Sequence, residues 1–334
     1  MNTMDQQKLT RIARALVAPG KGILAMDESS GTIRKRFEEV GVKDTEETRR
    51  AYREMLLTTP GLGRYISGAI LFDETIRQKT AAGIPFPAVL KKQGIIPGIK
   101  VDKGTREFAP GELLTEGLDD LRERLAEYRM LGAQFAKWRV VIAIGNGIPS
   151  EACIDANARA LAQYALLCQQ QGIVPVVEPE VLMDGTHTIQ RSFEVTVAVQ
   201  KAVFAELKKS GVACEGIILK PNMVLSGYGC AEQADSETVA EMTVRCLREA
   251  VPREVAGIAF LSGGQSDEDA TARLNAINRK YKGSVPWRLT FSYGRGMQRE
   301  ALKVWDGKAA NVAVAQRAVL KRARENGGAS EGIL

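Results

Sequence analysis

The segment 215–224, EGIILKPNMV, places a lysine directly after an apolar run. Such a run is typical of a strand buried on both faces of a parallel sheet, which puts Lys220 at the strand's carboxyl end. Burial among apolar groups disfavours the ammonium form of a lysine, so its pKa falls and more neutral amine is present to attack a carbonyl. A lysine that is ion-paired or extends its ammonium group to water is the alternative, and Lys220 in isolation fits it better.

Other apolar runs also end in ionisable or anion-binding residues. They are Asp27, Asp73, Lys100 with Asp102, Lys137 with Arg139, Glu178 with Glu180, Ser262 with Gly263 and Gly264, and Ser292 with Gly294 and Arg295. Residues two apart on a strand share a face, so Lys137 lies beside Arg139, and Glu178 beside Glu180. Two carboxylates this close raise the pKa of one of them, which suits a general acid or base. Salt bridges to the basic residues are a compatible alternative.

Two clusters in the sequence could bind anions. The loop 262–266, SGGQS, precedes a predicted helix and offers backbone N–H groups and a positive helix end to a phosphate. Arg295, between two glycines, supplies a cation where barrels commonly bind phosphate, after strands seven and eight. Lys35 and Arg36 with Lys100 form a second candidate cluster, although a solvated helix face explains Lys35 and Arg36 equally well.

Eight predicted strands alternate with helices along the chain. The strands are 22–27, 65–72, 95–101, 135–144, 173–177, the apolar run before Lys220, 255–261 and 287–293. This alternation predicts one (β/α)8 TIM barrel spanning residues 1–334 as a single domain, with an N-terminal helix at 4–18 and a C-terminal helix and short tail at 308–334. A doubly wound sheet is the alternative, but the turn after the first strand, DESSG at 27–31, lacks its glycine-rich dinucleotide pattern.

The composition excludes several classes of protein. With 45% hydrophobic and 26% charged residues, the chain resembles a soluble globular protein, and no apolar run is long enough to cross a membrane. A net charge of +6 from scattered basic residues predicts no nucleic-acid partner. A single histidine, His187, without zinc-site spacings, predicts no metal. The first residues lack a signal-peptide or transit-peptide pattern, so we expect a cytoplasmic protein.

Seven stretches resemble class I fructose-bisphosphate aldolase. They are KGILAMDES at 21–29, GIKVDKG at 98–104, FAKWR at 135–139, VEPE at 177–180, LKPNMV at 219–224, LSGGQS at 261–266 and LTFSYGR at 289–295. The resemblance runs in register from about Leu9 to Asn326. It implies a metal-independent enzyme that needs no cofactor, usually a homotetramer, acting in glycolysis and gluconeogenesis. Its substrates would be fructose 1,6-bisphosphate and the triose phosphates glycerone phosphate and glyceraldehyde 3-phosphate.

The resemblance also implies roles for individual residues. Lys220 would form an imine (a Schiff base) with the substrate ketone, Glu178 would dehydrate the carbinolamine, and Asp27 would take the proton of the C4 hydroxyl. Lys137 would hold a positive charge near both acids. The distal phosphate and the substrate hydroxyls would be addressed by Ser29, Lys35, Arg36, Lys100 and Arg139. The C1 phosphate would be bound by Ser262, Gly263, Gly294 and Arg295.

The chain departs from the family at its C-terminal end. The family's tail ends in a tyrosine assigned to proton transfer at the enamine, whereas no tyrosine follows Tyr293 here. Either the natural protein has a tail that this sequence lacks, or the enamine is protonated by another group or by water; we expect slower product release than in relatives with the tail. Other interpretations stay open, namely another lysine Schiff-base aldolase of transaldolase type, or a non-catalytic scaffold or sugar-phosphate-binding protein. The sequence also leaves open the choice among fructose 1,6-bisphosphate, fructose 1-phosphate and sedoheptulose bisphosphate.

Overall fold

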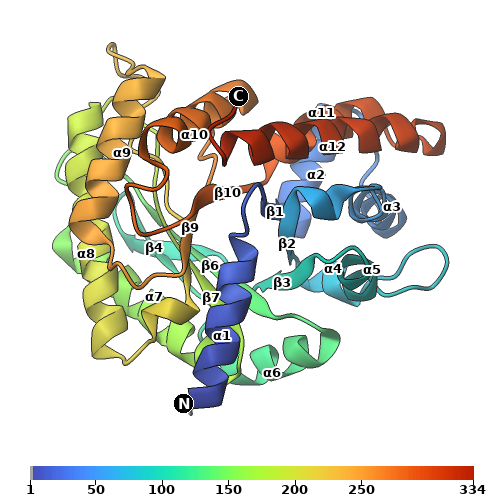
Figure 1. Cartoon of the computed structure of the whole chain (residues 1–334), viewed down its shortest axis with the longest axis horizontal. Coiled ribbons are helices and arrows are strands. Elements are labelled where there is room, and N and C mark those ends of the chain that lie inside the picture. The colour runs from blue at the N-terminus through green and yellow to red at the C-terminus, as the bar shows by residue number, and fades with distance from the viewer. Residues whose placement is uncertain (1–2) are drawn as a thin grey trace.

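Eight parallel strands close into a barrel in the computed structural model (Figure 1), which describes residues 3–334; Met1 and Asn2 lie outside the described residues. The strands are β1 (Gly22–Met26), β2 (Ile66–Leu71), β3 (Ile96–Lys100), β6 (Phe135–Ile142), β7 (Val174–Val181), β8 (Ile218–Leu219), β9 (Gly257–Phe260) and β10 (Leu289–Tyr293). Each pairs with the next along the chain, and β10 returns to pair with β1. The predicted (β/α)8 barrel is confirmed.

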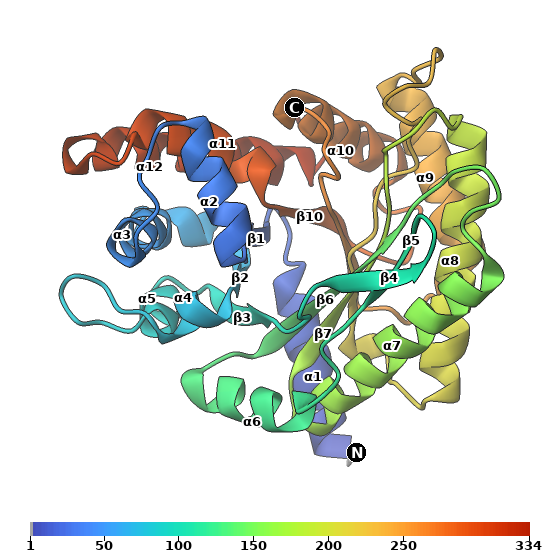
Figure 2. The same cartoon turned by 180° about the vertical axis from the view of Figure 1, so that it is seen from behind.

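Helices surround the barrel (Figures 1 and 2). The main ones are α3 (Glu46–Leu57), α6 (Leu121–Leu131), α7 (Glu151–Gln170), α8 (Ile189–Lys209), α9 (Ser236–Ala250), α10 (Asp267–Tyr281), α11 (Arg295–Trp305) and α12 (Val312–Ala329). Their starts follow local sequence signals. Ser150 caps α7 and Ser266 caps α10, each accepting a hydrogen bond from the N–H three residues ahead. Thr45 caps α3 through a capping box with Thr48.

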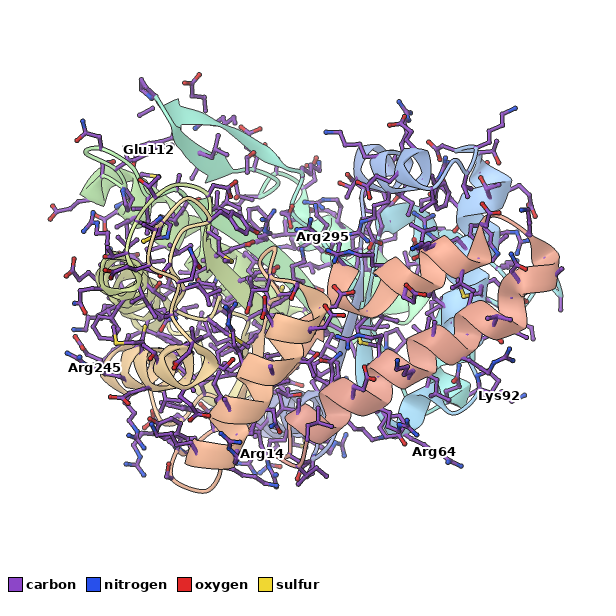
Figure 3. All side chains as sticks on the ribbon, turned by 90° about the horizontal axis from the view of Figure 1, so that it is seen from above. Arg14, Arg64, Lys92, Glu112, Arg245 and Arg295 are labelled. Carbon is purple, nitrogen blue, oxygen red and sulfur yellow. The ribbon has the colours of Figure 1, made fainter. Side chains whose placement is uncertain are left out.

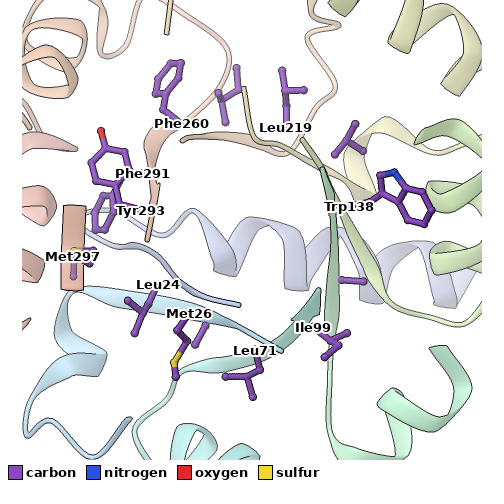
Figure 4. Packing of buried hydrophobic residues seen from close by; sticks show 14 of the residues in the cluster. Leu24, Met26, Leu71, Ile99, Trp138, Leu219, Phe260, Phe291, Tyr293 and Met297 are labelled. Atoms are coloured by element: carbon purple, nitrogen blue, oxygen red, sulfur yellow. The ribbon is translucent and has the colours of Figure 1, made fainter. Parts of the chain in front are cut away.

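Alternation along each strand divides the apolar residues between two layers. On β1, Leu24 and Met26 point outward and pack under the helices, whereas Ile23 and Ala25 point into the barrel. Figure 4 shows part of the outer layer, including Trp138 of β6. Trp138 packs on Tyr164 of α7, with ring centroids 5.5 Å apart, so the residues on either side of it in sequence face the barrel interior.

The inner layer is apolar only in its lower half, where helix α1 (Thr3–Leu16) covers the start of the strands. Leu9, Ile12 and Leu16 of α1 belong to the same buried cluster as the inward residues of the strands. The contact is close enough to require glycine at Gly68 of β2, because a Cβ there would lie 2.6 Å from a Leu16 methyl. We call this cluster the barrel floor; it consists of Leu9, Ile12, Ala13, Leu16, Val17, Ile23, Ala25, Ile70, Phe135, Val174, Val176, Ile218 and Ala259.

Some elements differ from the sequence-based expectation. Strand β7 continues to Val181, so Glu178 and Glu180 lie within it, and β8 has only two residues. The helices α2 (Ser30–Glu39), α4 (Asp73–Arg77) and α5 (Phe86–Lys92) were not predicted. Neither was the hairpin of β4 (Thr105–Ala109) and β5 (Glu112–Thr115) (Figure 2). Strand β4 is largely exposed and α2 buries only Ile33 and Phe37, so both lack a strong apolar pattern.

The residues after α12 pack along the side of the molecule. Asn275 of α10 exchanges two hydrogen bonds with the backbone of Leu334, at 2.9 and 3.1 Å. Glu331 accepts a hydrogen bond from the N–H of Gly20 at 2.8 Å. Across residues 3–334, no helix is both long and apolar enough to cross a membrane.

Candidate active site

The barrel mouth holds a cavity of about 840 Å³ at the carboxyl ends of the strands. All but one of the site residues proposed from the sequence line it: Asp27, Ser29, Arg36, Lys100, Lys137, Arg139, Glu178, Glu180, Lys220, Ser262, Gly263, Ser292, Gly294 and Arg295. The exception is Lys35, which is exposed on α2 and does not line the cavity. Lys35 therefore fits the alternative interpretation, a residue on a solvated helix face, better than membership of the second anion cluster.

The catalytic candidates occupy the upper inward positions of the strands whose lower positions form the barrel floor. Ala25 is followed two residues on by Asp27, Phe135 by Lys137, Val176 by Glu178 and Ile218 by Lys220. Because inward positions recur every second residue, these side chains stand directly above the apolar ones. The same alternation that buries the floor therefore places the ionisable groups inside the mouth.

Lys220 and Glu178 form a buried ion pair. Register sets them side by side, because Leu219 of β8 pairs with Val177 of β7, and the Lys220 N–H donates to the Val177 carbonyl at 2.8 Å. The two side chains are only 5% and 4% exposed, and Lys220 Nζ lies 2.9 Å from Glu178 Oε1. The proton on the ammonium group thus has a carboxylate within direct transfer distance.

Lys137 bridges the acids from the neighbouring strand. Its Nζ lies 2.7 Å from Asp27 Oδ2, 3.3 Å from Glu178 Oε2 and 3.9 Å from Asp102 Oδ2. Burial alone would lower the pKa of Lys137, but the three carboxylates raise it above its ordinary value. Lys137 therefore stays positively charged and contacts both Asp27 and Glu178 through one ammonium group.

Both acids are more acidic in the folded protein than in water. Burial would raise the pKa of Asp27, but Lys137, followed by Lys220, lowers it to about 2. For Glu178, burial likewise raises the pKa, and Lys220, Lys137 and Arg139 together outweigh it and lower the pKa. The sequence predicted a raised pKa for one of the two carboxyls, Glu178 or Glu180; for Glu178 the shift has the opposite direction, because facing cations outweigh burial. Glu180 pairs with Arg139.

The loop between β9 and α10 offers unpaired donors to an anion. Gly263 and Gly264 both have positive φ, at 54° and 85°, a conformation that favours glycine. Within the described part of the chain, the N–H groups of Ser262, Gly263 and Gly264 make no hydrogen bond. The Ser292 hydroxyl is buried in the cavity wall and has no partner among the described residues. Three free N–H groups and a hydroxyl form an anion cradle.

Two arginines border the cradle. Arg295 begins α11 and is exposed at the mouth, and it lies near the middle of the view in Figure 3, whereas Arg14, Arg64 and Lys92 lie near its edges. Arg36 of α2 approaches from the other side: its Nη2 lies 3.9 Å from the position that a Cβ on Gly294 would occupy. Lys100, whose Nζ pairs with Asp102 at 2.5 Å, supplies a further cation deeper in the cavity.

A hydrogen-bond chain that the sequence-based interpretation missed holds Arg36 in place. The Tyr52 hydroxyl donates to Gln298 at 3.0 Å, Gln298 donates to Glu28 at 3.0 Å, and Glu28 pairs with Arg36. In the sequence, only the position of Glu28 beside Asp27 in the DES motif at 27–29 pointed to it. No motif pointed to Gln298. Asp102 was noted at a strand end but received no role, although it contacts both Lys100 and Lys137.

Comparison with known proteins decides the family. A family model described as "Fructose-bisphosphate aldolase class-I" matches residues 8–334. The chain belongs to the class I fructose-bisphosphate aldolase family. The resemblance drawn from the motifs is thus confirmed, and the protein is an aldolase, a carbon–carbon lyase.

Individual aldolases are similar over nearly the whole chain. A "Probable fructose-bisphosphate aldolase class 1" of Xanthomonas campestris pv. campestris is 59% identical over 332 residues, covering 98% of this chain and 99% of the relative. "Fructose-bisphosphate aldolase 4, cytosolic" of Arabidopsis thaliana is 53% identical over 316 residues, covering 94% and 80%. A crystal structure of the Plasmodium falciparum aldolase, solved with TRAP and a small-molecule inhibitor, has a TM-score of 0.97 at 47% identity, covering 99% of this chain and 96% of that one.

Proposed function

We propose that this aldolase reversibly cleaves fructose 1,6-bisphosphate to glycerone phosphate and glyceraldehyde 3-phosphate through an imine on Lys220. The observation that carries the proposal is the buried cluster in which Lys220 contacts Glu178, and Lys137 joins Glu178 to Asp27. Imine chemistry with carbon–carbon cleavage requires an amine, a proton acceptor beside it and a separate base. Lys220, Glu178 and Asp27 are such a set, and the charge of Lys137 lies beside both acids.

The first half of the reaction uses Lys220 and Glu178. Glu178, 2.9 Å away, accepts a proton from the ammonium group, and the neutral amine then attacks the C2 carbonyl of the substrate. Glu178 returns the proton to the carbinolamine hydroxyl, which leaves as water, and a protonated imine remains. Lys137 retains its charge throughout and keeps the acid oriented.

The second half uses Asp27. With a pKa of about 2 it is a carboxylate at neutral pH, ready to accept the proton of the C4 hydroxyl. The electrons of the C3–C4 bond move into the protonated imine and give a neutral enamine, while the aldehyde half departs. Water, or another group of the site, then protonates the enamine at C3, and Asp27 passes its proton to solvent. A second water hydrolyses the imine, which releases glycerone phosphate and regenerates Lys220.

The two anion-binding sides of the cavity fit a substrate with a phosphate at each end. We propose that the C1 phosphate binds to the N–H groups of 262–264 with Ser292, Gly294 and Arg295. The distal phosphate and substrate hydroxyls bind to Ser29, Arg36, Lys100 and Arg139, all of which line the cavity. Glu180 orients Arg139 through their ion pair. This arrangement favours a bisphosphate over a substrate with one phosphate.

Reductive trapping tests the proposal. The protein is incubated with glycerone phosphate, reduced with borohydride and digested, and the peptide masses are measured. We expect a covalent adduct on Lys220 and none in Lys220→Met. Lys100→Met is the matched control because Lys100 also lines the cavity, and its adduct should remain on Lys220. Absence of an adduct, or an adduct on a different lysine, would contradict the mechanism.

We also propose that the protein is a cytosolic homotetramer. The cytosolic location is supported by the similarity to the Arabidopsis relative named as cytosolic, and the tetramer by family membership. Light scattering on the purified protein should give about four times the chain mass of 36.3 kDa. A mass of one or two chains would contradict the tetramer.

A further inference from the structure

Tyr228 lies in the segment that joins β8 to α9. Its backbone is fastened to the loop after β7: the Tyr228 N–H donates to the Met183 carbonyl at 2.8 Å. The neighbouring glycines make the same kind of bond, Gly227 to His187 at 2.8 Å and Gly229 to Gly185 at 2.9 Å. The two loops approach closely, since a Cβ on Gly227 would lie 2.5 Å from the Gly185 carbonyl oxygen. The tyrosine therefore projects from a fixed backbone.

The Tyr228 side chain reaches across to the anion cradle. Its hydroxyl oxygen lies 1.8 Å from the position that a Cβ on Gly264 would occupy, and Arg295 Nη2 lies 3.7 Å from the same position. The phenol and the guanidinium group thus flank Gly264, whose N–H has no partner among residues 3–334. Yet the residue is 54% exposed, which is a large apolar surface to leave in solvent. Packing alone does not explain why the ring stands there.

The hydroxyl is available as a donor. Its hydrogen bond to the Gly263 carbonyl spans 3.4 Å, well beyond the usual O–H···O length of about 2.8 Å, and is correspondingly weak. Burial raises the pKa of Tyr228; the charge of Arg295 opposes this, and Asp184 and Glu180 add to it. The phenol is therefore protonated at neutral pH. An anion arriving between Arg295 and the loop would offer it a better acceptor than Gly263 does.

We propose that Tyr228 is a further substrate-binding residue, whose hydroxyl turns from the Gly263 carbonyl to donate a hydrogen bond to the C1 phosphate. The tyrosine closes the cradle on its solvent side, opposite Arg295, and distinguishes phosphorylated from unphosphorylated ketones. This inference rests on the proposed function, because it assumes that the cradle at 262–264 receives the phosphate of a substrate bound at Lys220.

Tyr228→Phe tests the inference because it removes the hydroxyl and keeps the ring. Aldol condensation is measured with glycerone phosphate and with unphosphorylated dihydroxyacetone, each at saturating glyceraldehyde 3-phosphate. For glycerone phosphate we expect KM to rise by about 10- to 100-fold, the loss of one hydrogen bond to a charged group, with kcat changed less than about twofold. KM for dihydroxyacetone should not change. Inhibition by inorganic phosphate should weaken by the same factor as binding of glycerone phosphate.

Controls separate the outcomes. Tyr281→Phe, at the end of α10, removes a hydroxyl remote from the cradle and should leave all constants unchanged. An unchanged KM for glycerone phosphate in Tyr228→Phe would overturn the inference. So would an equal rise for both ketones, because that indicates a distorted loop. Borohydride trapping at saturating glycerone phosphate should still label Lys220 in Tyr228→Phe. Failure of trapping in the unmodified protein would refute the proposed function instead.

Discussion

Replacing Lys137 with methionine would remove one buried charge on which two carboxylates depend. Methionine keeps much of the length and bulk of the lysine stem but not its ammonium group. The pKa of Asp27 is lowered from 3.8 to about 2, mainly by Lys137 acting against burial. At 1.36 kcal/mol per pKa unit, this difference corresponds to about 2 kcal/mol of stability at neutral pH. Because Glu178 also loses a partner, we expect a total loss of about 3 kcal/mol at pH 7.

The sign of the pH dependence follows from the direction of the Asp27 shift. A lowered pKa in the folded state contributes stability that is present above 3.8 and lost only as the pH falls through about 2. The unmodified protein therefore keeps this contribution at pH 4. Without Lys137, burial, the largest single influence, is opposed mainly by Lys220 and Lys100, so the pKa of Asp27 rises and its protonation at low pH relieves part of the unpaired charge. The deficit of Lys137→Met should shrink to about half between pH 7 and pH 4.

The free energy of unfolding, measured by urea denaturation at pH 7 and pH 4, checks this reasoning. Lys92→Met is the matched control, because Lys92 projects from the end of α5 into solvent (Figure 3) and should change stability by less than about 0.5 kcal/mol. A deficit of equal size at both pH values would refute the electrostatic account and indicate a packing effect. A stability equal to that of the unmodified protein at pH 7 would refute it as well.

Three further changes test other parts of the structure. Glu178→Gln should slow imine formation by about 10²- to 10⁴-fold, measured by rapid quenching into borohydride, and an unchanged rate would exclude Glu178 as the acid. Gln298→Ala, which breaks the hydrogen-bond chain to Glu28, should raise KM severalfold for fructose 1,6-bisphosphate but not for fructose 1-phosphate; equal effects would argue against a role at the distal phosphate. Leu16→Ala should lower the free energy of unfolding in urea by about 2–5 kcal/mol, because Leu16 is fully buried in the barrel floor. Met4 is 77% exposed, so Met4→Ala should lower it little. Similar losses in both variants would contradict the packing of α1.

The barrel was predictable because buried parallel strands appear in the sequence as apolar runs. Since all eight strands run in the same direction, the carboxyl ends of these runs lie together at the barrel mouth. The partners within the mouth were not predictable, because they depend on register between strands distant in sequence. Glu178 shows this: the sequence reveals that Glu180 lies two residues away, but not that Lys137 of β6 and Lys220 after β8 face Glu178 and lower its pKa. Lys35 and Arg36 are a second example. Consecutive residues of a helix face different directions, and of these two only Arg36 lines the cavity, which the sequence did not reveal.

Contacts between residues far apart in the sequence were also not predictable. Glu28 and Gln298 lie 270 positions apart in sequence yet share a hydrogen bond, and neither residue type signals such a partner. The β4–β5 hairpin escaped prediction for a different reason: its first strand is mostly exposed, so it carries no alternation of apolar and polar residues.

The barrel floor also shapes the electric field of the site. Hydrocarbon side chains from α1 and the lower strands fill the space beneath Lys220 and Lys137. Such a medium polarises weakly, so from below it screens the charges above it far less than water would. The interactions among Lys220, Lys137 and their carboxylate partners are then screened mainly from the open mouth, where an anionic sugar phosphate arrives. Helix α1, which contributes no group to the chemistry, thus keeps water away from the lower side of these charges.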